Sequence, residues 1–249
     1  ETAMPMISDK VWTAEEVVDF SFEHGEQKDP WHGMEYSNTG YVLAGMIIAK
    51  ETGKPYSDHL RRRIFEPMGM EDTWVGTHEE FPLDREARGY MHADDDDNGQ
   101  WDVSGAGDPK DGVWDSTEWF PLSGANAAGD MISTPNDCVK FLNALFDGKI
   151  LSKKQLWEMK DNLDSAAFPG SNTTHHGHGI MGFTYDDLLI KGHLGQIPGH
   201  TSVMGRDEKN CTTAMLIQNS GAGDFESFYL AGVNEPMASI FAETANISK

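Results

Sequence analysis

The chain has 249 residues, enough for one large domain or two small ones with a sizeable core. Its 41 acidic residues outnumber the 19 basic residues and give a net charge of −22. This balance excludes the basic footprint of nucleic-acid binding and is typical of proteins from salt-loving sources. No apolar run is long enough to span a membrane, and no signal peptide is recognisable at the N-terminus. The two cysteines, Cys138 and Cys211, lack metal-ligand spacing and are predicted to be buried free thiols.

The first predicted helix covers residues 40–52. Leu43, Met46, Ile47 and Lys50 follow three-four spacing, and Gly53 is a natural C-terminal stop.

A second helix is predicted to begin at Ser57 and to end at Pro67 and Gly69. Its apolar positions are Leu60, Ile64 and Phe65. Residues 75–125 follow, rich in Asp, Gly, Pro and Trp, and are interpreted as an irregular excursion or small lobe.

Two further helices carry clear N-terminal signals. Thr134 can cap the third, with Pro135 in its first turn, Asp137 at the capping-box position, and a buried stripe of Phe141, Leu142 and Leu145. Ser152 and Gln155 repeat the capping-box spacing and predict a fourth helix.

From residue 179 onward the pattern changes to short strand-like runs separated by Gly, Pro and Asn. These runs are GIMGFTYDDLLI, TSVMGRD and CTTAMLIQNS, and a helix around 225–245 follows them. Helices first, then antiparallel strands, then a helix favour an α+β fold.

A Tyr-Ser-Asn run, Tyr36 to Asn38, precedes the first predicted helix. One interpretation is capping, in which the side chain of Asn38 accepts from free N–H groups of the first turn and Tyr36 is an ordinary half-buried tyrosine. The other interpretation is that Tyr36 and Asn38 face a reaction centre.

Three stretches in order resemble the serine β-lactamase and penicillin-binding-protein superfamily, over about residues 30 to 245. They are YSNTGYVLAGMIIAKETGKPYSDHLRRRIFEPMGMEDTW, AAGDMISTPNDCVKFLNALFDGKILS and GHLGQIPGHTSVM. The branch that they resemble contains class C β-lactamases, D-alanyl-D-alanine carboxypeptidases, D-aminopeptidases and esterases. The resemblance implies an antiparallel sheet flanked by helices, with a mostly helical lobe, in a single domain of which residues 1–249 are the larger C-terminal fragment.

The resemblance also implies roles for the matching residues. Tyr36 and Asn38 match the Tyr-x-Asn motif, and His193 with Gly195 matches the Lys/His-x-Gly motif. Tyr36 would then be the general base and acid, Asn38 would position substrate, and His193 would tune charge and orient Tyr36. Gly195 would let substrate lie against the strand, and the backbone N–H of Gln196 would belong to an oxyanion hole. Taken alone, His193 would be a structural histidine.

Two departures from the family pattern bear on function. Position 194 is Leu, where carboxypeptidases and β-lactamases place Thr or Ser, so substrates without a free carboxylate are favoured. No lysine has Ser or Thr three positions before it, so the Ser-x-x-Lys nucleophile motif is absent from these residues. We therefore expect a complementary polypeptide segment to supply the nucleophile and to cover a sheet edge that the chain leaves open.

Two other clusters were considered as metal sites. Asp94, Asp96, Asn98 and Gly99 fall at calcium-loop spacing with Asp102 nearby, but position 105 is Gly where the closing Glu belongs, so a solvated acidic loop is the better interpretation. The HHGHG run at 175–179 is interpreted as mobile surface rather than a zinc site. No cofactor is predicted, and a structural cation at the acidic loop is the less favoured alternative to a solvated loop.

The sequence thus predicts a serine hydrolase that forms an acyl-enzyme with D-amino-acid peptides, amides or esters. The alternative is a binding or regulatory module that kept the pocket and lost the nucleophile. The resemblance favours a secreted or periplasmic location.

Overall fold

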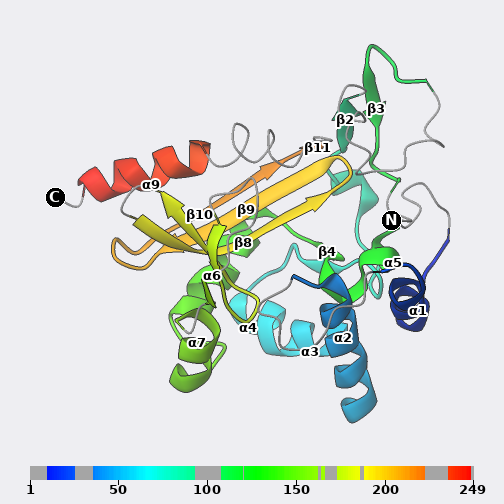
Figure 1. Ribbon diagram of the computed structural model, residues 1–249, viewed down its shortest axis with the longest axis horizontal. Coiled ribbons are helices and arrows are strands. Elements are labelled where there is room, and N and C mark those ends of the chain that lie inside the picture. Colours follow the sequence, from blue (N-terminus) through cyan, green and yellow to red (C-terminus); the bar gives the residue numbers. More distant parts are fainter. Residues whose placement is uncertain are drawn as a thin grey trace.

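The computed structural model describes residues 10–25, 36–92, 108–119, 121–161, 164–165, 173–185, 188–221 and 235–247. Its centre is a six-stranded antiparallel sheet with the order β10-β9-β8-β7-β6-β5 (Figure 1). The strands are β5 (Asp164–Ser165), β6 (Thr173–His176), β7 (Met181–Tyr185), β8 (Leu188–Ile197), β9 (His200–Asp207) and β10 (Thr212–Gln218). The sheet and the helices around it confirm the predicted α+β class.

Helices cover both faces of the sheet (Figure 1). On one face α9 (Glu235–Ile247) packs Met237 and Phe241 against Phe183, Ile190 and Val203. On the other face lie α6 (Pro135–Phe146) and α7 (Lys153–Lys160). Their buried residues meet the sheet in a second apolar cluster made of Leu142, Leu145, Phe146, Leu156 and Ile180. Burial of these clusters on both faces supplies the main driving force for folding.

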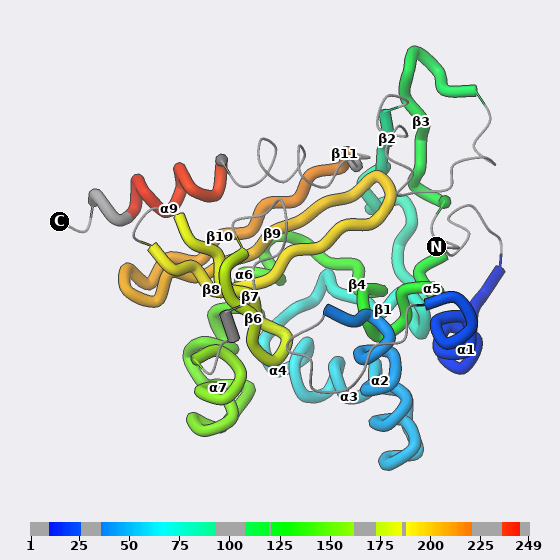
Figure 2. The backbone as a smooth tube through the Cα atoms, viewed as in Figure 1, coloured from blue at the N-terminus to red at the C-terminus, as the bar shows by residue number. Residues whose placement is uncertain are grey.

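The helical lobe is built from α1 (Ala14–His24), α2 (Asn38–Thr52), α3 (Tyr56–Leu60), a π-helical stretch (Arg61–Phe65), α4 (Glu66–Met68) and α5 (Leu122–Ala125). The tube in Figure 2 shows α2 and α3 below the sheet and α1 beside α2. Val17, Val18 and Val42 form the contact between α1 and α2, together with Trp12. Helix α1 has no counterpart among the predicted elements, although Thr13 and Glu16 form a complete capping box.

Short elements complete the fold. They are β1 (Trp74–Val75) with β4 (Met131–Ile132), a 3-10 turn at Leu83–Arg85, a three-stranded group of β2 (Tyr90–His92), β3 (Val113–Asp115) and β11 (Ser220–Gly221), and a 3-10 turn at Asn126–Ala128. The described parts of the predicted excursion, residues 75–125, hold only such short elements. Within the described residues, no helix combines the length and apolarity that crossing a bilayer requires.

The buried face of α2 does not carry the three-four spacing of Leu43 and Ile47. Val42 and Gly45 are buried, whereas Leu43 is 39% and Ile47 is 61% exposed. The predicted helix is confirmed, but α2 is apolar on nearly every side, so three-four spacing can be found along more than one face.

One predicted helix boundary also changes. The second helix begins at Tyr56 rather than Ser57, although it ends as expected at Gly69, in the left-handed conformation. The described part of the C-terminal helix begins at Glu235. The fourth predicted helix is confirmed as α7, with both halves of its Ser152–Gln155 capping box formed.

The third predicted helix is confirmed as α6, but one of its residues has a different partner. Thr134 accepts from the backbone N–H of Asp137, as expected of a cap. The buried Asp137 carboxylate instead accepts from the backbone N–H of Asp72 and the hydroxyl of Thr73, and it pairs with Lys140. Asp137 therefore joins α6 to the start of β1 rather than completing a capping box.

Both cysteines are free, as predicted, but their burial differs from the prediction. Cys138 is half-buried in α6, and burial raises the pKa of its thiol. Cys211 is exposed in the turn between β9 and β10, where its φ of 54° is left-handed.

Candidate active site

Tyr36 and His193 meet across the interface between the helical lobe and the sheet. Tyr36 stands two residues before α2, and His193 lies in β8. Their ring centroids are 6.3 Å apart with the planes tilted by 41°. Both side chains line one cavity of about 160 Å³, so the fold brings together two residues that are distant in the sequence.

The start of α2 positions Tyr36. The Oγ of Ser37 accepts from the backbone N–H of Gly40 at 3.2 Å, which makes Ser37 the N-cap and Asn38 the first helical residue. The expectation that Asn38 caps the helix is therefore wrong. Ser37 contributes to the cavity wall, and the Asn38 side chain is exposed beside it.

The hairpin between β6 and β7 forms the opposite wall. The N–H of Gly177 donates to the carbonyl of Ile180 at 2.7 Å, and Gly179 has a φ of 76°, so the turn is tight. A Cβ on Gly179 would lie 3.1 Å from the hydroxyl oxygen of Tyr41. Glycine therefore allows the hairpin to approach the side chain of Tyr41 from α2.

His176 is a cavity residue that the sequence interpretation missed. The HHGHG run was predicted to be mobile surface, but His176 belongs to β6, is only 5% exposed and lines the cavity with Tyr36 and His193. A His-Gly turn directly before an apolar strand was the available signal for a hairpin. Among the described residues, no group of three or more His, Cys, Asp or Glu could hold a metal ion. The acidic run with Asp94, Asp96, Asn98 and Asp102 lies outside the described residues.

The electrostatics of the cavity keep both central groups uncharged at neutral pH. Burial raises the pKa of Tyr36, and the nearby Tyr41 raises it further. Burial lowers the pKa of His193. The hydrogen bond to the carbonyl oxygen of Leu194 raises this pKa in part, and the nearby His176 lowers it further. A neutral His193 therefore supplies no cation that would lower the pKa of Tyr36.

The same hydrogen bond identifies the reactive edge of the imidazole. His193 Nδ1 lies 2.5 Å from the carbonyl oxygen of Leu194 and must donate to it. In the neutral ring Nε2 then carries the lone pair and is an acceptor. The described residues that line the cavity include neither Lys nor Arg.

The three residues after His193 lie along the rest of β8. Leu194 is opposite Val203 and packs against the apolar cluster under α9, so its side chain points away from His193. A Cβ on Gly195 would lie 3.0 Å from the Oγ of Ser202. Gly195 and Gln196 follow His193 toward the end of the strand and are not among the described residues that line the cavity.

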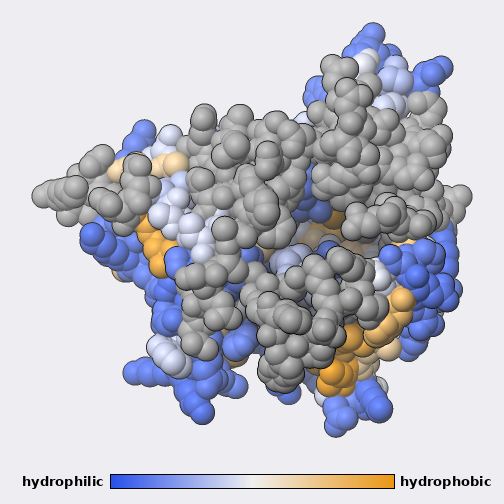
Figure 3. All heavy atoms as spheres, viewed as in Figure 1, coloured by the Kyte–Doolittle hydropathy of each residue, from blue (hydrophilic) through white to orange (hydrophobic). Residues whose placement is uncertain are grey.

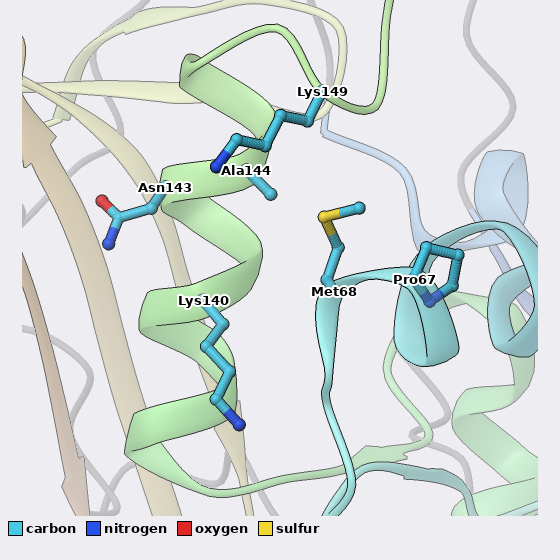
Figure 4. Close-up of a pocket in the computed structure, with 6 residues that line it drawn as sticks. All are labelled: Pro67, Met68, Lys140, Asn143, Ala144 and Lys149. Carbon is cyan, nitrogen blue, oxygen red and sulfur yellow. The ribbon is translucent and has the colours of Figure 1, made fainter.

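A second cavity, of about 350 Å³, lies between α4 and α6 (Figure 4). Lys140 in its wall donates to the carbonyl of Gly69 and to Asp137, and the Oδ1 of Asn143 accepts from Arg206 and Thr213. Its polar groups thus join structural elements, which makes the smaller cavity at Tyr36 the better candidate for an active site.

Comparisons with known proteins show which family the chain resembles. A family model described as Beta-lactamase matches residues 1–232. The structure is similar to that of D-amino acid amidase from Ochrobactrum anthropi SV3 complexed with L-phenylalanine, with a TM-score of 0.96 and 75% identity over 100% of this chain and 69% of that chain. It is also similar to a D-stereospecific amidohydrolase from Streptomyces sp., with a TM-score of 0.70 and 28% identity over 90% of this chain and 62% of that chain.

Among curated proteins, penicillin-binding protein 4* of Bacillus subtilis is 27% identical over 217 residues, which are 85% of this chain and 46% of that protein. The chain spans about half the length of the curated relatives it matches. Because the family model covers most of the sequence, the chain belongs to the beta-lactamase family, within the superfamily of serine β-lactamases and penicillin-binding proteins.

Proposed function

We propose that this chain is the larger part of a serine hydrolase that cleaves amides of D-amino acids through an acyl-enzyme. The observation that carries the proposal is the meeting of Tyr36 and His193 in one cavity at the start of α2. The 75% identity to a protein described as a D-amino acid amidase supports the choice of substrate class.

In the proposed reaction a serine Oγ attacks the amide carbonyl carbon and loses its proton to the Tyr36 phenolate. Tyr36 then gives the proton to the departing ammonia as the carbon–nitrogen bond breaks. Water hydrolyses the resulting ester by the reverse proton route. Asn38 positions the substrate, the ring of His193 packs beside Tyr36 and orients it, and the N–H of Gln196 stabilises the oxyanion.

The nucleophile is proposed to lie on a complementary segment that carries Ser-x-x-Lys. Two observations support this: no Ser-x-x-Lys occurs in the sequence, and no Lys or Arg is among the described residues that line the cavity. Because burial raises the pKa of Tyr36, the phenol needs a nearby cation to act as a base at neutral pH. The lysine of the segment would provide it.

A neutral substrate is favoured over one with a free carboxylate. In family members with Thr or Ser at the position of Leu194, the hydroxyl is implied to help hold a carboxylate. Leu194 has no donor, and its side chain packs under α9. We therefore expect the complemented enzyme to prefer a C-terminal amide over the corresponding acid.

The test uses this chain combined with the portion of the Ochrobactrum amidase that it does not cover. Ammonia release from D-phenylalanine amide, with L-phenylalanine amide as the matched control, should show D-selective turnover. A fluorophosphonate should label a serine on the added portion. If the complex forms but neither turnover nor label is seen, the alternative of a non-catalytic binding module replaces the proposal.

A further inference from the structure

Helix α2 carries a second apolar face that points away from the rest of the lobe. We define the outer face of α2 as Tyr41, Leu43, Ile47 and Ile48, which are 42%, 39%, 61% and 39% exposed. Figure 3 shows hydrophobic atoms gathered where α2 lies in Figure 1. A surface helix of a globular protein normally presents polar residues on the side opposite its core contact, whereas a helix that is apolar all round is normally buried.

The inner face of the same helix is already packed. Val42 contacts the α1 cluster, and a Cβ on Gly45 would lie 2.7 Å from the Cβ of Ala127. The charged side chains of α2, Lys50 and Glu51, stand at its C-terminal end. The outer face therefore has the apolar composition of a contact surface. This composition differs from the polar surface that an acidic protein otherwise presents.

The outer face continues into the candidate active site. Tyr41 belongs to both, because it lines the cavity with Tyr36 while remaining 42% exposed. A polypeptide that covers the outer face would therefore extend to the cavity mouth.

Two observations identify the occupant. This chain superposes on the Ochrobactrum amidase with a TM-score of 0.96 but covers only 69% of it, so that relative has further polypeptide to pack. A second copy of this chain is a poor alternative, since a net charge of −22 makes two copies repel each other. We infer that the outer face of α2 is the docking surface for the nucleophile-bearing segment, an inference that rests on the proposed function.

The first test is photo-crosslinking with the portion of the Ochrobactrum amidase that this chain does not cover. p-Benzoylphenylalanine at position 47 should crosslink to that portion. The same probe at position 83, where Leu83 is 70% exposed outside α2, should not. Absence of crosslinking at position 47, equal crosslinking at both positions, or crosslinking of position 47 to a second copy of this chain would overturn the inference.

A second test does not depend on association in solution. The amidase portion is fused to this chain, and Ile47→Asp is made in the fusion and in the 249-residue chain. We expect the Tm of the fusion to fall by roughly 5 °C or more and that of the chain alone to change by about 1 °C or less. Leu83→Asp is the control and should leave both Tm values unchanged. Equal small effects of Ile47→Asp in both proteins would contradict the inference.

Hydrolysis of D-phenylalanine amide is measured separately on the same fusion. A contact at position 47 without hydrolysis removes the proposed function and leaves the docking surface in place. Hydrolysis without the contact removes the docking surface and leaves the proposed function.

Discussion

The two faces of α2 are both apolar, but only the inner face is packed against the rest of the lobe. The inner face packs Val42 and Gly45 against α1 and the turn at Asn126–Ala128. The outer face leaves Ile47 61% exposed and ends at the cavity that holds Tyr36. The difference indicates that the inner face secures the lobe, while the outer face is the surface that we propose a further polypeptide covers.

The largest expected effect concerns the chemistry at the start of the helix. In the complemented enzyme, Tyr36→Phe should lower kcat by about 10²–10⁴-fold, because the general base and acid is lost. The Tm should change little, since Tyr36 is 42% exposed and only a hydroxyl is removed. Steady-state ammonia release and a thermal scan check both parts, and near-normal turnover would remove Tyr36 from the mechanism.

The next effect tests the inner face. Gly45→Ala should lower the free energy of unfolding by about 1–3 kcal/mol, because the new methyl would clash with Ala127 and lie near 3.2 Å from Tyr56. Urea unfolding of the 249-residue chain measures it. An unchanged midpoint would mean that the inner face is looser than the structure shows.

Acid should lower the free energy of unfolding by protonating Glu79, which joins Arg61 of the helical lobe to β1. The hydrogen bond from Arg61 lowers the pKa of Glu79, with a further contribution from the N–H of Val75. A lowered carboxyl pKa stabilises the fold above the unfolded value of about 4.3 and loses this contribution as the pH falls through the folded value. Stability should therefore drop as the pH falls below about 4.3, and Glu79→Gln should flatten that part of the curve by about 1 kcal/mol.

The smallest effect tests the outer side of the helix. A Cβ on Gly40 would meet nothing closer than 3.7 Å, so Gly40→Ala should stabilise the 249-residue chain by about 0.5–1 kcal/mol through helix propensity. Gly40→Ala and Gly45→Ala thus form a matched pair of opposite sign on one helix. Destabilisation by Gly40→Ala in the same urea experiment would show that the outer side is already packed.

Much of the fold could be predicted where local chemistry decides the structure. Thr134 before Pro135 and Ser152 before Gln155 mark the starts of α6 and α7, because capping is a local interaction. The antiparallel strands from β7 to β10 follow from short runs separated by turn residues. The capping box of Thr13 and Glu16 is a local signal of the same kind and marks the start of α1.

The remaining features depend on contacts that the sequence does not display. The buried face of α2 could not be chosen by periodicity, since Leu43 and Ile47 are as apolar as Val42. The motif residues Tyr36 and His193 do meet, but the burial that neutralises both is a tertiary property. His176 joins them only because a hairpin turn folds β6 onto β7.

The most direct measurement is ammonia release from D-phenylalanine amide by the 249-residue chain, alone and combined with the missing portion of the Ochrobactrum amidase. We expect no turnover above background by the homogeneous chain, D-selective turnover by the complemented chain, and loss of that turnover in Tyr36→Phe. Full turnover by the homogeneous 249-residue chain would contradict the claim that the nucleophile lies outside these residues.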